Sequence, residues 1–123
     1  MSRTILVADD AAFMRMLIRE ILSAEGYVVH EAVNGRDAVE KFVEVRPDLV
    51  TMDLTMPQMD GITALSRIRE LDPSARVVIV TAQSAADAVI ATFDAGALDF
   101  ITKPFQPAKL VETVRKCLAS ALR

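Results

Sequence analysis

The sequence has very little cysteine, few aromatic residues and no excess of positive charge. Its 123 residues include one cysteine, one tyrosine and no tryptophan. The single cysteine, Cys117, cannot form a disulfide within the chain, which excludes a disulfide-bonded scaffold. It lies in helical register with Leu110 and Val114, so we expect it in the core. The 14 basic residues against 17 acidic ones give a net charge of −3, the wrong sign for binding the phosphates of a nucleic acid.

Long apolar segments are absent as well. No apolar run exceeds four residues, so the sequence predicts neither a membrane-spanning helix nor a signal peptide. We therefore expect a cytoplasmic protein that has neither a membrane nor a nucleic acid as a partner. With 52% apolar residues, the chain suits one folded domain over residues 1–123, which we expect to be a monomer.

Five short segments rich in β-branched residues alternate with segments of helical periodicity. The expected strands are residues 4–8, 27–32, 49–52, 76–80 and 99–102. Three of them are almost continuously apolar, as parallel strands covered on both faces are. The strand at 27–32 is more mixed, which favours an edge position with His30 on the surface. This alternation predicts the α/β class, with one doubly wound (βα)5 flavodoxin-like domain around a parallel five-stranded sheet.

The helical segments have recognisable ends. Gly26 follows the first helix and Gly96 the fourth, where a residue of positive φ commonly ends a helix. Pro47 and Pro73 follow the second and third helices, and Pro107 suits the first turn of the fifth. These signals support five strand and helix pairs in one domain.

Polar side chains follow the carboxyl ends of four of these strands. Asp9 and Asp10 follow the first strand and Asp53 the third, while Thr81 and Lys103 end the fourth and fifth. In a sheet of order 2-1-3-4-5 the first and third strands are neighbours, so the three carboxylates converge. Two unit charges about 4 Å apart repel by about 4 kcal/mol at an effective dielectric constant of about 20, so positive charge must offset the cluster. Lys103 supplies one charge, and Mg²⁺, which prefers oxygen ligands, suits the site.

Together these groups supply what phosphoryl transfer to a carboxylate requires. A free carboxylate, a metal, a hydroxyl and an ammonium provide a nucleophile and partners for the phosphoryl oxygens. Taken singly, Asp10 or Thr81 could cap a helix, Asp53 could form a turn, and Lys103 could be a solvated residue. Their common place at one edge of the sheet favours an aspartyl phosphate on Asp53.

The same residues carry a resemblance to a known family over the whole chain. Asp9-Asp10, Asp53 followed by LTMPQMDG, Thr81-Ala82 and Lys103-Pro104 resemble the signature of the receiver domains of two-component response regulators. Within that family, the stretch DDAAFMR at residues 9–15 is most similar to the stand-alone chemotaxis regulators. The resemblance implies the strand order 2-1-3-4-5 and a phosphorylation-dependent signalling switch.

The resemblance also implies the metal ligands and the phosphoacceptor. Asp53 would accept a phosphoryl group from a histidine kinase of the chemotaxis type. Asp9, Asp10, Asp53 and the backbone carbonyl of Thr55 would hold Mg²⁺. The protein would not be an enzyme, apart from self-phosphorylation by phosphodonors and autodephosphorylation.

The output would follow from a second set of residues. The resemblance implies that Lys103 pairs with the phosphoryl group, that Thr81 donates its hydroxyl to it, and that the Lys103-Pro104 peptide is cis. Phe100 would be the switch aromatic, which changes the face made by the fourth helix, fifth strand and fifth helix. A downstream protein such as a flagellar switch component would bind that face, and a phosphatase would be a further partner.

Two departures from the family pattern bear on the output. The switch aromatic is Phe100, so no phenolic hydroxyl anchors either of its positions. The fourth helix starts with Ser84, Ala85, Ala86 and Asp87, where the enteric chemotaxis regulators carry lysines, so the output face is less basic and its target can differ.

Four other functions are compatible with parts of this pattern. A receiver could act as a phosphorelay intermediate outside chemotaxis. A Mg²⁺-dependent phosphohydrolase of the haloacid-dehalogenase type would need a second aspartate where Thr55 stands. A flavodoxin-like FMN binder would meet repulsion from Asp9 and Asp10. A binding module without turnover, in which the acidic pocket is structural, is the fourth alternative, and phosphorylation chemistry distinguishes it.

Overall fold

In the computed structural model, which describes residues 2–120, five strands and five helices alternate along the chain. The strands are β1 (Thr4–Ala8), β2 (Val28–Ala32), β3 (Leu49–Met52), β4 (Val77–Thr81) and β5 (Asp99–Thr102). The helices are α1 (Ala12–Ala24), α2 (Gly35–Val45), α3 (Gly61–Leu71), α4 (Ala86–Asp94) and α5 (Pro107–Ala119). None of the helices described over residues 2–120 is long and apolar enough to cross a membrane.

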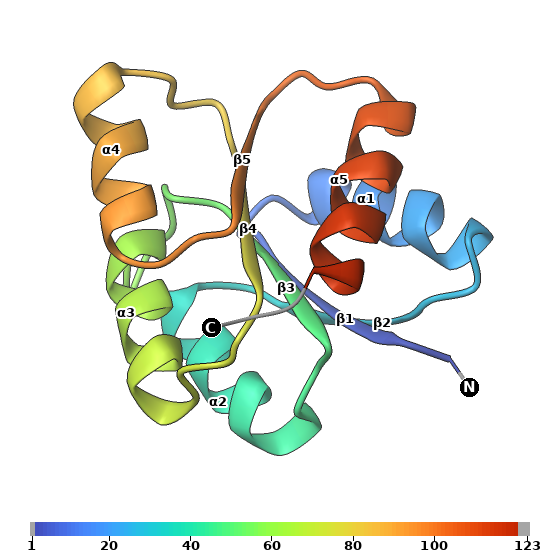
Figure 1. The fold of residues 1–123 in the computed structure, drawn as a ribbon, viewed down its shortest axis with the longest axis horizontal. Coiled ribbons are helices and arrows are strands. Elements are labelled where there is room, and N and C mark those ends of the chain that lie inside the picture. Colours follow the sequence, from blue (N-terminus) through green and yellow to red (C-terminus); the bar gives the residue numbers. More distant parts are fainter. Residues whose placement is uncertain (1, 121–123) are drawn as a thin grey trace.

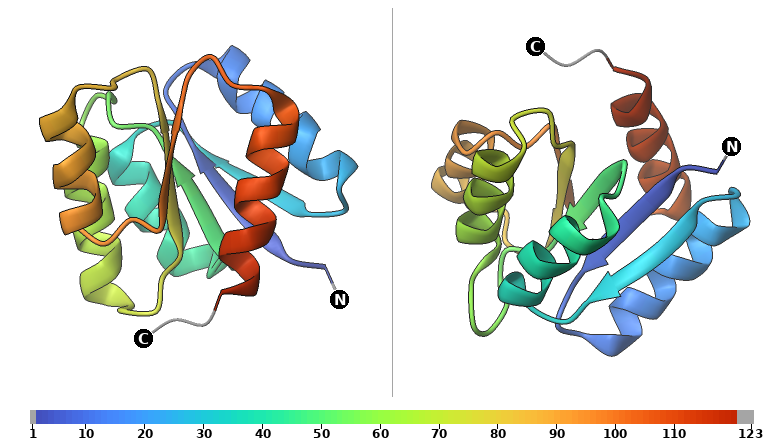
Figure 2. Two further views of the ribbon diagram at one scale, coloured as in Figure 1. Left: turned by 45° about the horizontal axis from the view of Figure 1, so that its top comes forward. Right: turned by 90° about the horizontal axis from the view of Figure 1, so that it is seen from below.

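The five strands form one parallel sheet in the order β2-β1-β3-β4-β5, which confirms the predicted order. Helices α1 and α5 cover one face of the sheet, and α2, α3 and α4 cover the other (Figures 1 and 2). After β1 the chain continues to β2 on one side of the sheet, and after β3 it continues to β4 on the other side. The carboxyl ends of these two strands therefore border the position where ligands of doubly wound folds bind.

One apolar layer on each face holds the helices to the sheet. On β1, Ile5 and Val7 belong to the layer under α1 and α5, whereas Leu6 and Ala8 belong to the layer under the other helices. All four are buried, and burial of a large aliphatic side chain contributes about 1.5–3 kcal/mol. The sheet is therefore a firm base for the polar residues that follow its carboxyl ends.

Two strand boundaries differ from the prediction by one residue. β2 begins one residue later, because the backbone N–H of Tyr27 still donates to the carbonyl of Leu22 in the last turn of α1. β4 is shifted by one residue toward the C-terminus, because Thr81 pairs with Thr102 of β5. The shift places Thr81 on the strand itself, where the backbone fixes its direction.

Other expectations about single residues are confirmed. Gly26 and Gly96 have φ values of 93° and 106° and follow the ends of α1 and α4. Pro107 lies in the first turn of α5, and His30 is exposed on the edge strand β2. Cys117 is buried on α5, and this burial raises the pKa of its thiol. The thiol therefore packs as a core group.

Candidate functional site

The sheet brings the three predicted carboxylates together. β1 pairs with β3 so that Ala8 lies opposite Met52, and Asp9 and Asp53 directly follow the ends of these strands. Asp9, Asp10 and Asp53 each offer a carboxylate oxygen, and these oxygens all lie within 4.8 Å of one another. The predicted convergence is therefore confirmed.

Lys103 lies between two members of this cluster. Its Nζ donates to Asp9 Oδ2 at 2.6 Å and to Asp53 Oδ2 at 3.0 Å. Burial alone lowers the pKa of Lys103, but the hydrogen bonds and charges of Asp9 and Asp53 outweigh it, and the pKa is raised. The lysine therefore offsets the repulsion between the two buried carboxylates. The charge of the exposed Asp10 stays uncompensated by any ion pair among residues 2–120.

The donor set of this cluster fits Mg²⁺. Three carboxylates and one ammonium leave a surplus of negative charge at a partly buried site. Carboxylate oxygens are the ligands that Mg²⁺ prefers, and the exposed Asp10 leaves the cluster open to solvent on one side. The site therefore has both the ligand chemistry and the access that a hydrated divalent cation needs.

Asp53 is fixed through its backbone. Its N–H donates to the carbonyl of Ala8 at 3.0 Å, and its Oδ1 accepts a long bond of 3.4 Å from the N–H of Thr55. A Cβ at Gly61 would lie 2.1 Å from the carbonyl oxygen of Asp53, so only glycine lets α3 start this close to the Asp53 loop. These contacts keep the Asp53 carboxylate next to those of Asp9 and Asp10.

Thr81 and Phe100 lie on the neighbouring strands. Thr81 is buried at the end of β4, and its Oγ1 accepts a long bond of 3.4 Å from the N–H of Gln83. The Ncap of α4 is Ala85, which makes no side-chain bond, so Thr81 does not cap this helix. Phe100 on β5 is half-buried and, like Ala88 and Ala95, packs against the apolar layer under α2, α3 and α4. The cis Lys103-Pro104 peptide is confirmed.

The response regulator receiver domain family matches residues 5–115. The chain belongs to this family. It is 53% identical to the chemotaxis protein CheY of Bacillus subtilis over 119 residues, which is 96% of this chain and 99% of that protein. It is 50% identical to the chemotaxis protein CheY of Thermotoga maritima over 117 residues, or 94% and 98% of the two chains.

A solved structure agrees with these relatives. A chain of the CheX-CheY-BeF3-Mg²⁺ complex from Borrelia burgdorferi superimposes with a TM-score of 0.92 at 36% identity, covering 96% of this chain and 90% of that one. Receiver domains of the CheY type are signalling proteins and not classical enzymes. Membership therefore implies phosphorylation-dependent signalling for this receiver domain.

The structure adds contacts that the sequence pattern did not single out. Arg15 on α1 donates from Nη1 to the carbonyl of Asp9 at 2.8 Å and from Nε to Glu31 on β2 at 3.1 Å. Gln83 donates from its side chain to the hydroxyl of Thr55 across the mouth of the site. The only sequence signal for Arg15 was its place in the motif DDAAFMR. No local pattern indicated that its partner would be Glu31.

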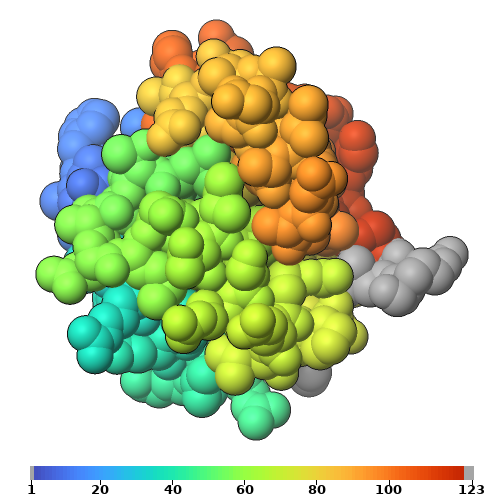
Figure 3. All heavy atoms as spheres, turned by 90° about the vertical axis from the view of Figure 1, so that its left-hand side faces the viewer, coloured from blue at the N-terminus to red at the C-terminus, as the bar shows by residue number. Residues whose placement is uncertain are grey.

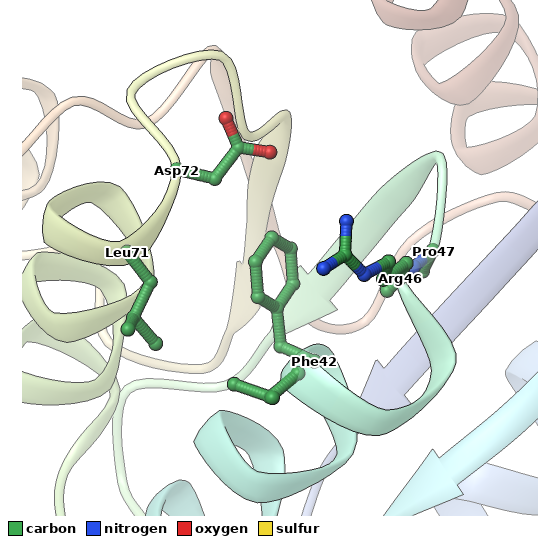
Figure 4. Close-up of a pocket in the computed structure, with 6 residues that line it drawn as sticks. Phe42, Arg46, Pro47, Leu71 and Asp72 are labelled. Carbon is green, nitrogen blue, oxygen red and sulfur yellow. The ribbon is translucent and has the colours of Figure 1, made fainter.

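One cavity lies away from the carboxylates. It has a volume of about 440 Å³ and lies between the last turns of α2 and α3, next to the side chains of Phe42, Arg46, Leu71 and Asp72 (Figure 4). The helices of this fold run back from the carboxyl ends of the strands, so their last turns lie at the opposite end of the sheet from Asp53. This cavity is therefore separate from the carboxylate cluster.

Proposed function

We propose that this receiver domain accepts a phosphoryl group on Asp53 from a phosphohistidine of a chemotaxis-type histidine kinase. A carboxylate oxygen of Asp53 forms the new P–O bond while the P–N bond to the donor imidazole breaks. The observation that carries the proposal is the position of Asp53, which lies at a strand end beside Lys103 and two further carboxylates. This arrangement places the nucleophile beside a fixed cation and surrounds the incoming group with charge of both signs.

In this proposal Asp9, Asp10, Asp53 and the backbone carbonyl of Thr55 hold Mg²⁺. The ion, when bound, neutralises charge on the phosphoryl oxygens. Lys103 already contacts Asp53 Oδ2, so its ammonium can follow the charge onto a phosphoryl oxygen without a large movement. Within residues 2–120 the Thr81 hydroxyl accepts one long bond and donates none, so its proton is free to be donated to a second phosphoryl oxygen.

The output in this proposal is a change of the face formed by α4, β5 and α5. Movement of Thr81 toward the phosphoryl group vacates space beside β4, and Phe100 turns inward to fill it. On helix α4, Ile90 and Phe93 are 60% and 45% exposed. Helix α4 lies on the left of the molecule in Figure 1, and Figure 3 views the molecule from that side. This apolar surface supports a downstream protein partner, and chemotaxis relatives favour a flagellar switch component.

A protein phosphodonor also needs a surface next to Asp53. Phe13 and Met16 on α1 are 70% and 50% exposed and lie about one and two turns beyond Asp10. They provide apolar area beside the phosphorylation site that supports docking of a kinase domain. A role as a phosphorelay intermediate would use the same acceptor and docking area, and would differ only in the protein that receives the phosphoryl group.

Intact-mass spectrometry with a small acyl phosphate tests the proposal. With Mg²⁺, the mass should rise by one phosphoryl group, about 80 Da, because the carboxylate is the nucleophile. Asp53→Ala should abolish the increase. The control is Asp94→Asn at the exposed end of α4, which should leave the increase unchanged. Modification that persists in Asp53→Ala, or is undiminished in excess chelator, would contradict the proposal.

A further inference from the structure

We propose that Arg15 is a positioning residue for the metal site, because it holds the peptide group between Asp9 and Asp10 and so directs the Asp10 carboxylate toward Asp9 and Asp53. This inference rests on the Mg²⁺ site of the proposed function. It concerns the orientation of the ligands and adds no ligand to the set.

The bond from Arg15 acts on a turn that has few other restraints. The carbonyl of Asp9 belongs to the same planar peptide group as the nitrogen of Asp10. Arg15 Nη1 donates to this carbonyl at 2.8 Å, across six residues and back over the start of α1. The Ncap of α1 is Ala11, which has no side chain that could cap the helix. The other bonds that restrain this turn through a side chain reach Asp9, whose Oδ1 accepts from the N–H of Ala11 at 2.9 Å and whose Oδ2 accepts from Lys103 at 2.6 Å.

Asp10 depends on this backbone restraint more than the other two carboxylates do. Asp9 accepts bonds from Lys103 and from the N–H of Ala11, and Asp53 accepts from Lys103. No hydrogen bond to the exposed carboxylate of Asp10 is found among residues 2–120. Its place in the cluster is therefore set by the backbone that precedes it, and the Arg15 bond fixes the orientation of that backbone.

Arg15 is itself held in place on the sheet. Its side chain is only 15% exposed, and its Nε donates to Glu31 Oε1 at 3.1 Å. Glu31 lies opposite Val7 in the register of β1 and β2, so its backbone is part of the rigid sheet. Its second carboxylate oxygen accepts from Arg19 at 2.6 Å. The guanidinium therefore links the turn, through the Asp9 carbonyl, to the sheet, through Glu31. Residues behind a metal ligand commonly hold it in this way.

A purely electrostatic role for Arg15 and a positioning role predict opposite changes in Mg²⁺ affinity when Arg15 is removed. If Arg15 acted only as a nearby positive charge, removing it would strengthen Mg²⁺ binding. If it positions Asp10, removing it weakens binding. Arg19 is the matched control, because it pairs with the same Glu31 carboxylate and carries the same charge but does not contact Asp9.

Isothermal titration of the unphosphorylated protein with Mg²⁺ tests this. We expect Arg15→Gln to bind Mg²⁺ about 10-fold more weakly than the wild type, the lower end of the effect of residues behind metal ligands. Arg19→Gln should bind equally or slightly more tightly. Arg15→Lys keeps the charge, but its single nitrogen cannot serve Asp9 and Glu31 in the same way, so it should also bind more weakly.

Amide chemical shifts show whether the effect passes through the proposed peptide group. In Arg15→Lys and Arg15→Gln without metal, the amides of Asp10 and Ala11 should shift, whereas those of α5 should not. If Arg15→Gln does not fold, Arg15→Lys decides the question alone. Unchanged or tighter Mg²⁺ binding in the Arg15 variants, or weaker binding without a shift at Asp10, would overturn the inference and leave the proposed function intact. Absence of Mg²⁺ binding by the wild type would overturn both.

Discussion

The two sides of the carboxyl edge of this sheet are held very differently. On the side of β1, Asp9 uses its N–H, its carbonyl and both carboxylate oxygens in hydrogen bonds. On the side of β4, the carbonyl of Thr81 accepts from the N–H of Lys103 at 2.8 Å, but its hydroxyl makes only one long bond within residues 2–120. Helix α4 buries only Thr92, whose hydroxyl bonds to its own helix. By contrast, α3 buries four residues and α5 buries five. Few buried contacts make an element easier to displace.

This difference suits a receiver domain that must hold one part still and move another. Phosphoryl transfer requires carboxylates that stay in place, because small displacements of reacting groups cost rate. Output requires an element whose two positions differ little in free energy, so that one new charged group can shift the balance. The bonded β1 side and the loosely held α4 side provide these two properties within one sheet.

We expect the largest effect on stability from removing the positive charge of Lys103. Lys103→Gln leaves the buried Asp9 and Asp53 carboxylates without their common partner. We expect a loss of about 3 kcal/mol in the free energy of unfolding in chelator, as when one partner of a buried ion pair is removed. Saturating Mg²⁺ should restore part of it. Urea unfolding with and without Mg²⁺ measures both values, and an unchanged stability in chelator would mean that Lys103 does not hold the site together.

The carboxylates themselves should respond in opposite directions. Asp10 is exposed and has no ion pair among the described residues, so Asp10→Asn removes repulsion and should raise stability in chelator by about 1 kcal/mol. Asp9→Asn should lower it, because Asp9 is buried and bonded to Lys103. Both variants should bind Mg²⁺ more weakly. Thermal unfolding in chelator decides, and the same sign of change in both variants would contradict this account.

On the β4 side, Thr81→Ala should lower stability less than Lys103→Gln does. It should nevertheless disrupt the response of α4 to phosphorylation of Asp53. Thr81→Ala removes a hydroxyl that makes only one long bond, so we expect a loss below about 1 kcal/mol. Phosphorylation of Asp53 should still occur, whereas the amides of α4 should no longer respond to it. Intact mass and amide shifts of the same sample measure the two effects. A full α4 response in Thr81→Ala would show that the signal leaves Asp53 by another route.

The smallest effect concerns the pH dependence at Glu31. The hydrogen bond from Arg19 is the main reason that the pKa of Glu31 is lowered from 4.5; burial opposes it and Arg15 adds to it. A carboxyl with a lower pKa in the folded state contributes stability above its unfolded pKa, and this is lost as the pH falls through the folded pKa. The stability difference between wild type and Glu31→Gln should therefore be constant near neutral pH and shrink below about pH 4.5. Urea unfolding across this range checks it, and a difference that grows on acidification would contradict the sign.

Much of this arrangement follows from local sequence. Continuous apolar strands and helix-ending glycines predict the parallel sheet, and polar residues after the strands predict the site residues. The strand order, and with it the convergence of Asp9, Asp10 and Asp53, follows from the family resemblance. The Arg15–Glu31 contact could not be predicted this way, because it depends on the register of β1 with β2, which no local pattern encodes. The single long bond of the Thr81 hydroxyl was not predictable either, because a buried hydroxyl at a strand end has several partners within reach. The helix-capping role considered for it was wrong.

Hydrogen exchange of backbone amides, with and without beryllofluoride and Mg²⁺, tests the contrast between the two sides most directly. Beryllofluoride occupies the place of a phosphoryl group on Asp53. In the free protein we expect amides of α4 to exchange faster than those of α1 beyond its first turn, and beryllofluoride should change exchange in α4 and β5 while leaving β1 unchanged. Equal protection of α1 and α4 in the free protein, or an equal response of β1 and α4 to beryllofluoride, would contradict the account.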